Sequence, residues 1–297
     1  DLKTPLEGFN EKLKKVIFQK ELGTVFEKVM RLKAHAKALQ KIVKISTPEK
    51  VQRAALLCKC DLATQMVYEF PELQGVIGKY YAEASGEEKE VAEAIDEHWM
   101  PRAENAPLPA SETGVIISLA DKIDNLIGCF AAELKPSSSS DPYALRRQVL
   151  GIVKTLIASQ LTLSLKDLLM ICTDHFSTTL AFSKEQVANE ILSFIHNRIK
   201  TVFQEYGFAK DEIEASLSKG CDDIYDTYCR IAALHAFRKE NAVQFSNLFE
   251  VYKRARGQLT NFSASQVDEK LFETKQEADL FEELGRQRLK IEQAIAD

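Results

Sequence analysis

The stretch VFEKVMRLKAHAKALQKIV (residues 25–43) decides the fold class, because its apolar residues recur at the spacing of an α-helix. Steps of four and three residues alternate along it and place one apolar stripe on a helix, at Val25, Val29, Leu32, Ala36, Leu39 and Val43. Its lysines fall largely off this stripe and predict a basic outer face, at Lys28, Lys33, Lys37, Lys41 and Lys44. The stretch therefore predicts an amphipathic helix with Leu32 and Leu39 in the core.

Composition extends this prediction to the whole chain. Only 12 of the 297 residues are glycine and 8 are proline, and these separate long segments of helical periodicity, so we predict an all-α fold. The net charge is −5, yet residues 1–50 carry twelve Lys and Arg against six Asp and Glu, so any polyanion must bind locally. Six cysteines without a CxxC pair favour a reducing cytoplasm, and no apolar stretch is long enough to predict a membrane span.

Loop-forming and capping residues divide the chain into two helical parts. We predict a helical domain over residues 1–165, a linker region over 166–183 and a helical bundle over 184–297. The loop at 135–142 ends in Asp141 and Pro142, which are expected to cap and start a helix. The last helix is expected over about 265–296, with Ser263 and Ser265 as capping candidates.

The chain has no glycine-rich phosphate loop, no GxSxG and no HExxH motif, so we expect no catalytic residue within it. One set of residues, by its order and spacing, resembles the HD domain, a helical metal-dependent phosphohydrolase scaffold: His35, Cys60, Asp61, His98 and Asp121. Cys60 stands where that pattern has its second histidine, and a hard-cation site prefers imidazole and carboxylate. We therefore expect these residues in one interhelical pocket as a vestigial site without metal.

Plainer interpretations of the same residues remain open. A histidine beside Ala36 on a helix is typical of a core or boundary position, which applies to His35. Asp121 and Asp124, on either side of Lys122, equally suit a hydrogen-bonded helix surface.

Two basic clusters are candidates for RNA binding. Arg198 and Lys200 are interleaved with Phe203 and Tyr206, and this combination suits phosphates and unstacked bases. A second cluster ends an amphipathic helix, at Lys253, Arg254 and Arg256. Cations are also favoured at a helix C-terminus by the helix dipole, so from spacing alone a solvated helix end explains these clusters better than RNA binding does.

Five longer blocks carry a family resemblance: FQKELGTVFEKVMR (18–31), RAALLCKCDLATQMVYEFPELQGVIGKYYA (53–82), EHWMPR (97–102), SLADKIDNLIGCF (118–130) and DPYALRRQVLGI (141–152). In their order they resemble the β subunit of bacterial glycyl-tRNA synthetase, strongly over 18–152 and more weakly over 185–285. The resemblance implies a degenerate HD domain at 1–165 and a helical anticodon-binding domain at 184–297. We expect the second domain to be truncated at Asp297.

The same resemblance implies a function. The family enzyme attaches glycine to tRNA(Gly) using ATP with Mg, its α subunit carries the adenylation site, and its β subunit binds tRNA. This chain is then the tRNA-binding portion, without a cofactor of its own, and its partners are tRNA(Gly) and an α subunit or fused α domain, in the cytoplasm. Arg146 and Arg147 are candidate RNA contacts, although one of them pairing with Glu69 or Asp61 is an equal alternative.

Two other functions compete with this interpretation. The HD-like residues are compatible with a metal-dependent phosphohydrolase acting on nucleotides, which Cys60 weakens. The basic helix at 25–43 and the acidic segment at 87–97 would equally serve a helical interaction module without catalysis.

Overall fold

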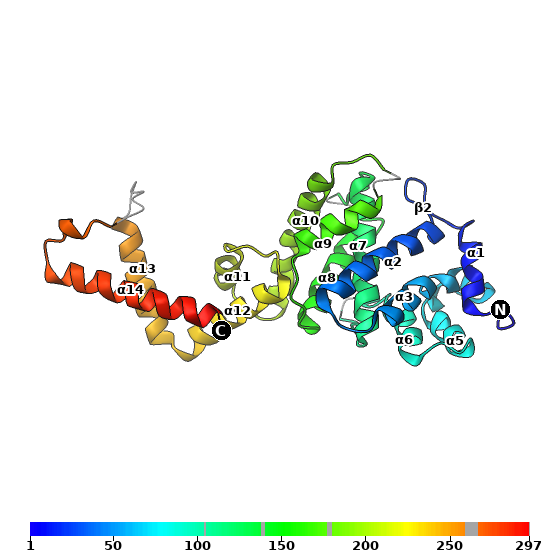
Figure 1. Ribbon diagram of the computed structural model, residues 1–297, viewed down its shortest axis with the longest axis horizontal. Helices are drawn as coiled ribbons and strands as arrows, with labels where there is room; N and C mark the ends of the chain where they lie inside the picture. The colour runs from blue at the N-terminus through cyan, green and yellow to red at the C-terminus, as the bar shows by residue number, and fades with distance from the viewer. Residues whose placement is uncertain (104, 138–139, 177–179, 259–266, 297) are drawn as a thin grey trace. The chain divides into compact units, whose positions relative to one another are not determined.

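Helices dominate the computed structural model, which describes residues 1–103, 105–137, 140–176, 180–258 and 267–296 (Figure 1). The predicted all-α fold class is therefore confirmed. The chain divides into two compact units, Asp1–Lys239 and Glu240–Asp297.

The first unit contains twelve α-helices within its described residues: α1 (Asn10–Leu13), α2 (Val25–Val43), α3 (Pro48–Leu57), α4 (Gln65–Glu69), α5 (Val76–Ala84), α6 (Lys89–Glu97), α7 (Glu112–Ala131), α8 (Leu145–Ala158), α9 (Leu165–Thr173), α10 (Lys184–Glu205), α11 (Lys210–Leu217) and α12 (Ile224–Glu240). Short 3₁₀ turns lie at η1 (Leu6–Phe9), η2 (Cys60–Ala63), η3 (Pro71–Leu73) and η4 (Asp174–Phe176). Two antiparallel strands, β1 (Ile17–Gln19) and β2 (Gly23–Thr24), precede α2.

Helix α2 begins and ends where its sequence dictates. Thr24 and Glu27 form a reciprocal capping box: Glu27 N donates to Thr24 Oγ1 at 3.2 Å, and Thr24 N donates to Glu27 Oε2 at 2.7 Å. At the other end, Lys44 adopts a left-handed conformation and its N–H donates to the carbonyl of Gln40. Leu32 and Leu39 are fully buried, which confirms the predicted stripe.

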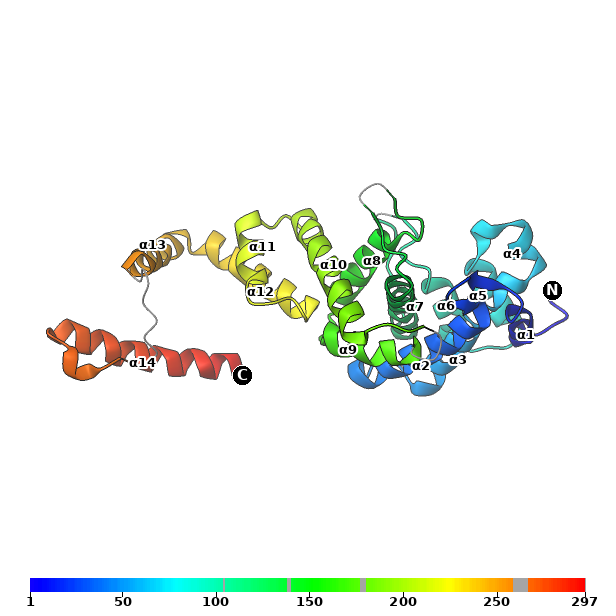
Figure 2. The ribbon, with the colours of Figure 1, turned by 90° about the horizontal axis from the view of Figure 1, so that it is seen from above.

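Helix α7 is the centre of the first unit. It packs against α2, α3, α6, α8, α9 and α10, and Figure 2 shows it lying among them. Because neighbours cover it on several sides, its polar residues are buried with its apolar ones, including Asp121 and Asp124. The interpretation of these two aspartates as a helix surface is therefore wrong.

Two helix starts differ from expectation. Helix α8 begins at Leu145, after a turn that contains Pro142, and the Asp141 carboxylate accepts from the N–H groups of Leu145 at 2.9 Å and Arg146 at 3.0 Å. Asp141 thus caps the helix as predicted, but from across a turn. Helix α14 (Lys275–Ala296) begins about ten residues later than expected, and the capping candidates Ser263 and Ser265 lie outside the described residues.

The segment expected to be a linker, 166–183, holds most of α9 and the turn η4. Leu168, Leu169, Cys172 and Phe176 are buried, and α9 packs against α2, α7 and α10. Up to Phe176 this segment is therefore a packed part of the first unit. The assignment of an HD-like and an anticodon-binding-type domain on either side of it stays a prediction.

The second unit contains α13 (Ala242–Gln258), the 3₁₀ turn η5 (Glu269–Leu271) and α14 among its described residues. The Phe272 and Phe281 rings meet edge to face with centroids 5.7 Å apart. Large apolar side chains remain exposed on both helices, among them Leu248 and Leu284. Across the described ranges, no helix is both long and apolar enough to cross a membrane.

Candidate functional site

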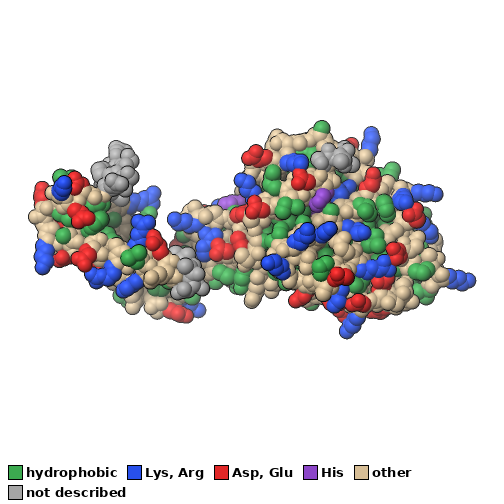
Figure 3. Space-filling model, viewed as in Figure 1, with side chains coloured by type: hydrophobic (Ala, Val, Ile, Leu, Met, Phe, Trp, Pro, Cys, Tyr) green, Lys and Arg blue, Asp and Glu red, His purple; other side chains and the backbone are tan. Residues whose placement is uncertain are grey.

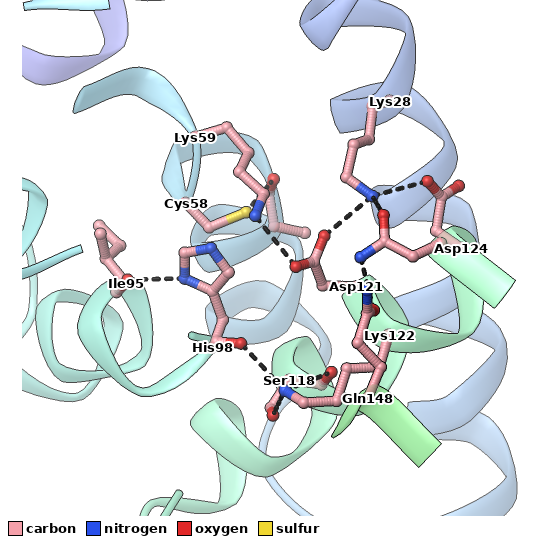
Figure 4. A network of polar contacts seen from close by, with 12 residues as sticks. Lys28, Cys58, Lys59, Ile95, His98, Ser118, Asp121, Lys122, Asp124 and Gln148 are labelled. Carbon is pink, nitrogen blue, oxygen red and sulfur yellow. Dashed lines mark hydrogen bonds and ion pairs between the residues drawn. The ribbon is translucent and has the colours of Figure 1, made fainter. Parts of the chain in front are cut away.

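A group of five charged side chains lies in the interior of the first unit, and we name it the buried charge cluster: Lys28, Arg31, Lys59, Asp121 and Asp124. Figure 4 shows Lys28, Lys59 and the two aspartates. Lys28 Nζ lies 3.0 Å from Asp121 Oδ1 and 2.8 Å from Asp124 Oδ2. Lys59 Nζ lies 3.0 Å from the other oxygen of Asp121, and Arg31 Nε lies 2.8 Å from Asp124 Oδ1. Lys28 and Arg31 lie on α2, Lys59 lies in the turn after α3, and the two aspartates lie on α7. The cluster therefore joins these three segments.

Mutual attraction keeps the cluster charged. Burial would raise the pKa of Asp121, but the ammonium groups of Lys28 and Lys59 outweigh it and hold that pKa far below its usual range. Burial opposes ionisation of Asp124 too, and there Lys28 and Arg31 lower the carboxyl pKa. Burial would also lower the pKa of Lys28, yet the two carboxylates raise it. Both carboxylates are thus neutralised by cations of the chain itself.

His98 lies beside the cluster as a neutral ring. Its Nδ1 donates to the carbonyl of Ile95 at 2.6 Å, which leaves Nε2 as an acceptor. Among the described residues, Nε2 has no hydrogen-bond partner, although the ring is fully buried. Burial and the nearby Lys59 ammonium lower the pKa of His98 well below its ordinary value.

His35 meets a different partner. Its Nδ1 lies 3.8 Å from Asp124 Oδ1, and its Nε2 donates to the carbonyl of Cys172 at 3.2 Å. Burial lowers the pKa of His35 to about 4, so the ring is neutral at pH 7. It is a core histidine that joins α2 to α9.

The hydrogen bonds of Cys60 and Asp61 in the described structure go to backbone groups and not to His35 or His98. Asp61 Oδ2 accepts from the backbone N–H of Gly75 at 2.6 Å, just before α5, and burial raises the pKa of this carboxyl. The Cys60 thiol lies 3.7 Å from the carbonyl of Leu56, and burial raises its pKa, so it is not a thiolate.

The five HD-like positions therefore do not form one ligand set. His98 and Asp121 lie together, His35 lies beside Asp124, and Cys60 and Asp61 engage other partners, while the expectation that all five share one interhelical pocket stays a prediction. Within the described ranges, no group of three or more His, Cys, Asp or Glu side chains is placed to hold a metal ion. Chemically, an arrangement whose carboxylates already bind ammonium groups suits the joining of helices better than hydrolysis.

A cavity of about 320 Å³ opens beside the cluster, and we name it the Trp99 cavity. The chain after α6, helix α7 and the start of α8 enclose it. Its charged and aromatic lining includes Trp99, Arg102, Asp121, Lys122, Tyr143 and Arg147.

The two candidate arginines of α8 point to different surroundings. Arg146 is half-buried and lies 3.9 Å from Asp141 Oδ2, while Arg147 is exposed and lines the Trp99 cavity. The described contacts include no ion pair from either arginine to Glu69 or Asp61, the alternative that the sequence left open.

The first basic cluster lies on α10. Arg198 and Lys200 are both half-buried, and the Arg198 guanidinium stacks over the Phe194 ring at 5.3 Å. Phe203 is fully buried, so it cannot stack on a base as the interleaved pattern suggested, whereas Tyr206 is 42% exposed. Only part of this cluster is open to a ligand.

The second basic cluster lies in the other unit, on α13, where Lys253, Arg254 and Arg256 are all exposed. Arg254 lies 3.5 Å from Glu250 one turn earlier, and Lys253 Nζ lies 5.7 Å from the centroid of the Phe249 ring. On the face drawn in Figure 3, basic and acidic side chains are interspersed.

Sequence reasoning missed the cations of the buried charge cluster. It placed Lys28 on a solvated face, whereas Lys28 is 2% exposed. A signal was present in the spacing, because residues 28, 31 and 35 follow one another by three and four and form a second stripe beside the apolar one. Lys59 offered no such signal, since it lies in a turn.

By its fold and site, the chain is an all-helical protein whose central carboxylates are neutralised by its own lysine and arginine side chains. A family model described as the glycyl-tRNA synthetase beta subunit matches residues 1–218. The chain belongs to this family.

Individual relatives agree with the family model. The chain is 41% identical over 285 residues to the glycine–tRNA ligase beta subunit of Syntrophomonas wolfei, covering 96% of this chain and 41% of the relative. It is 36% identical over 298 residues to the protein of the same name from Clostridioides difficile, covering 100% of this chain and 43% of the relative. The chain thus spans about two fifths of the length of these relatives.

Proposed function

We propose that this chain is the tRNA-binding portion of a glycine–tRNA ligase and supports ATP-dependent attachment of glycine to tRNA(Gly) by an α-type domain. Membership of the β-subunit family is the observation that carries the proposal. The partners are tRNA(Gly) and an α subunit or a fused α domain. ATP with Mg serves the complete enzyme, which works in the cytoplasm, and this chain contributes no catalytic residue and no cofactor.

Exposed cations support an RNA-binding role. The contact residues we propose are Arg146, Arg147, Arg198, Lys200, Lys253, Arg254 and Arg256. The exposed cations on α13 suit backbone phosphates better than base edges, because long side chains on a helix surface reach phosphates without fixed geometry. We assign residues 1–165 to an HD-like domain and 184–297 to an anticodon-binding-type domain, and the proposed RNA contacts lie in both.

A metal-dependent phosphohydrolase is the competing function, and the buried charge cluster argues against it. Lys28 and Lys59 both bind Asp121, so a divalent cation would have to displace an ammonium group from a buried site. The protonated Cys60 thiol adds no ligand for a hard cation.

The test is a tRNA(Gly) titration of the complete ligase carrying Lys253→Ala, Arg254→Ala and Arg256→Ala together. If these side chains bind phosphates, affinity falls for all tRNAs and the slope of log affinity against log salt flattens by up to about three. Loss of a base contact would instead weaken tRNA(Gly) selectively.

A matched variant controls for the change in charge. Lys37→Ala, Lys41→Ala and Lys44→Ala removes three exposed cations from α2 and its C-cap. We expect this variant to keep the affinity and salt slope of the unmodified ligase. Equal effects from both triple variants would show that total charge matters and would remove α13 from the interface.

A further inference from the structure

The Trp99 cavity combines features that the proposed function does not use. Its volume of about 320 Å³ lies at the small end of the range that ligands occupy, which suits one nucleotide and excludes a duplex. Trp99 and Tyr143 supply aromatic walls. Gln74 also lines the cavity. Such walls provide stacking and hydrogen bonding for a base.

The charge of the cavity favours an anion. Of its charged lining residues, Asp121 is already compensated by Lys28 and Lys59. Lys122 adds a positive charge, because burial lowers its pKa only to about 8. Its Nζ donates to the Met100 carbonyl and to Ser118 Oγ, each at 2.6 Å. Lys122 therefore contributes a positive electrostatic potential to the cavity and not a free hydrogen-bond donor.

The two arginines of the cavity are the groups available to a phosphate. Arg102 lies 2.5 Å from Asp96 at one nitrogen and keeps further guanidinium donors. No ion pair or hydrogen bond to another described residue holds the Arg147 guanidinium. A guanidinium without a partner at the edge of a cavity is suited to bidentate phosphate binding.

We propose that the Trp99 cavity binds a single unstacked nucleotide, with its phosphate on Arg147 and its base against Trp99 and Tyr143. The idea rests on the proposed function in naming RNA as the expected source of that nucleotide. A free mononucleotide has the same chemistry and is the other source.

The experiment measures binding of nucleoside 5′-monophosphates and of the matching nucleosides to the complete protein. The signal is tryptophan fluorescence, from which the Trp99→Phe variant is subtracted to isolate Trp99, the single tryptophan of this sequence. We expect Arg147→Ala to weaken monophosphate binding about tenfold or more, the usual effect of losing a charge-assisted hydrogen bond. Nucleoside binding should not change, because the nucleoside has no phosphate.

Lys89→Ala is the matched control. It removes an exposed cation that lies outside the cavity lining and is not among the proposed RNA contacts. Both substitutions replace an exposed cation in the first turn of a helix, α8 or α6, by a good helix former, so thermal unfolding should be unchanged in each. Equal effects of the two variants on monophosphate binding would overturn the proposal, and so would the absence of any Trp99 signal.

A second experiment distinguishes RNA from a free mononucleotide as the source of the ligand. It also distinguishes failure of the cavity proposal from failure of the proposed tRNA-binding function. If RNA supplies the nucleotide, a saturating monophosphate competes with a single-stranded RNA trinucleotide and Arg147→Ala weakens tRNA(Gly) binding. If tRNA(Gly) binds normally to Arg147→Ala while monophosphate binding is lost, the site takes a free nucleotide. If the unmodified ligase does not bind tRNA(Gly), the proposed function fails, whatever the cavity binds.

Discussion

At the residue scale, Lys59 is the cation whose removal most directly tests the buried charge cluster. Lys59→Met keeps an apolar stem against Trp99, over whose ring the ammonium now lies at 3.8 Å, but leaves Asp121 with one ammonium instead of two. We expect the free energy of unfolding to fall by about 3–5 kcal/mol, the cost of breaking a buried ion pair from one side. Urea unfolding monitored by far-UV circular dichroism measures it.

Lys50→Met is the control for this substitution. Lys50 Nζ lies 2.6 Å from Glu90, a pair as close as that of Lys59, but both side chains remain partly exposed. Exposed pairs add little to stability, so Lys50→Met should leave the unfolding free energy nearly unchanged. Similar losses from the two lysines would mean that Asp121 does not depend on Lys59.

His35 predicts a dependence of stability on pH. Its pKa is about 4 in the folded chain against an ordinary value of 6.5, so between these values the unfolded state binds the proton and the folded state does not. Stability is therefore retained above pH 6.5 and is lost as pH falls toward 4, by about 3 kcal/mol from this residue.

The His35→Gln variant checks that prediction, because a glutamine side chain does not titrate. Its unfolding free energy, measured in urea from pH 7 to pH 4, should decline less steeply than that of the unmodified chain by about 3 kcal/mol. The remaining decline belongs to groups such as His98, whose pKa is also lowered by burial. Parallel curves for the two proteins would contradict a neutral His35.

At the element scale, α2 offers a test with controls on the same helix. Leu32→Ala and Leu39→Ala each remove a fully buried side chain and should cost about 2–5 kcal/mol of unfolding free energy. Met30→Ala and Ile42→Ala remove side chains that are 47% and 37% exposed, and should cost less than about 1 kcal/mol. Equal losses at all four positions, measured by urea unfolding, would mean that the stripe is not the buried face.

The same scale shows which structure sequence patterns can predict. The 4-3 stripe of α2 correctly predicted its buried apolar face, but it placed Lys28 on the solvated face, whereas Lys28 is buried. In α7 the pattern also fell short, since Asp121 and Asp124 look like surface residues until Lys28 and Lys59, which are distant in sequence, are brought against them. Buried charge depends on a partner from another element, and local periodicity carries no record of that partner.

At the scale of the whole molecule, five sequence blocks indicated the family, whereas the HD-like pattern did not indicate which partners its side chains contact. His35 and Asp121 come from helices that pack together, α2 and α7. Their side chains nevertheless face different partners. The Trp99 cavity was not predicted either, since Trp99 and Arg147 line it from segments that are distant in sequence.

The most direct test of the central claim, that this chain contacts tRNA, is photo-crosslinking of tRNA(Gly) to the complete ligase with mass-spectrometric mapping of the crosslinked peptides. We expect crosslinks within residues 1–297, in the peptides that contain Arg147, Arg198 or Lys253–Arg256. Crosslinks found exclusively in other parts of the ligase would contradict it.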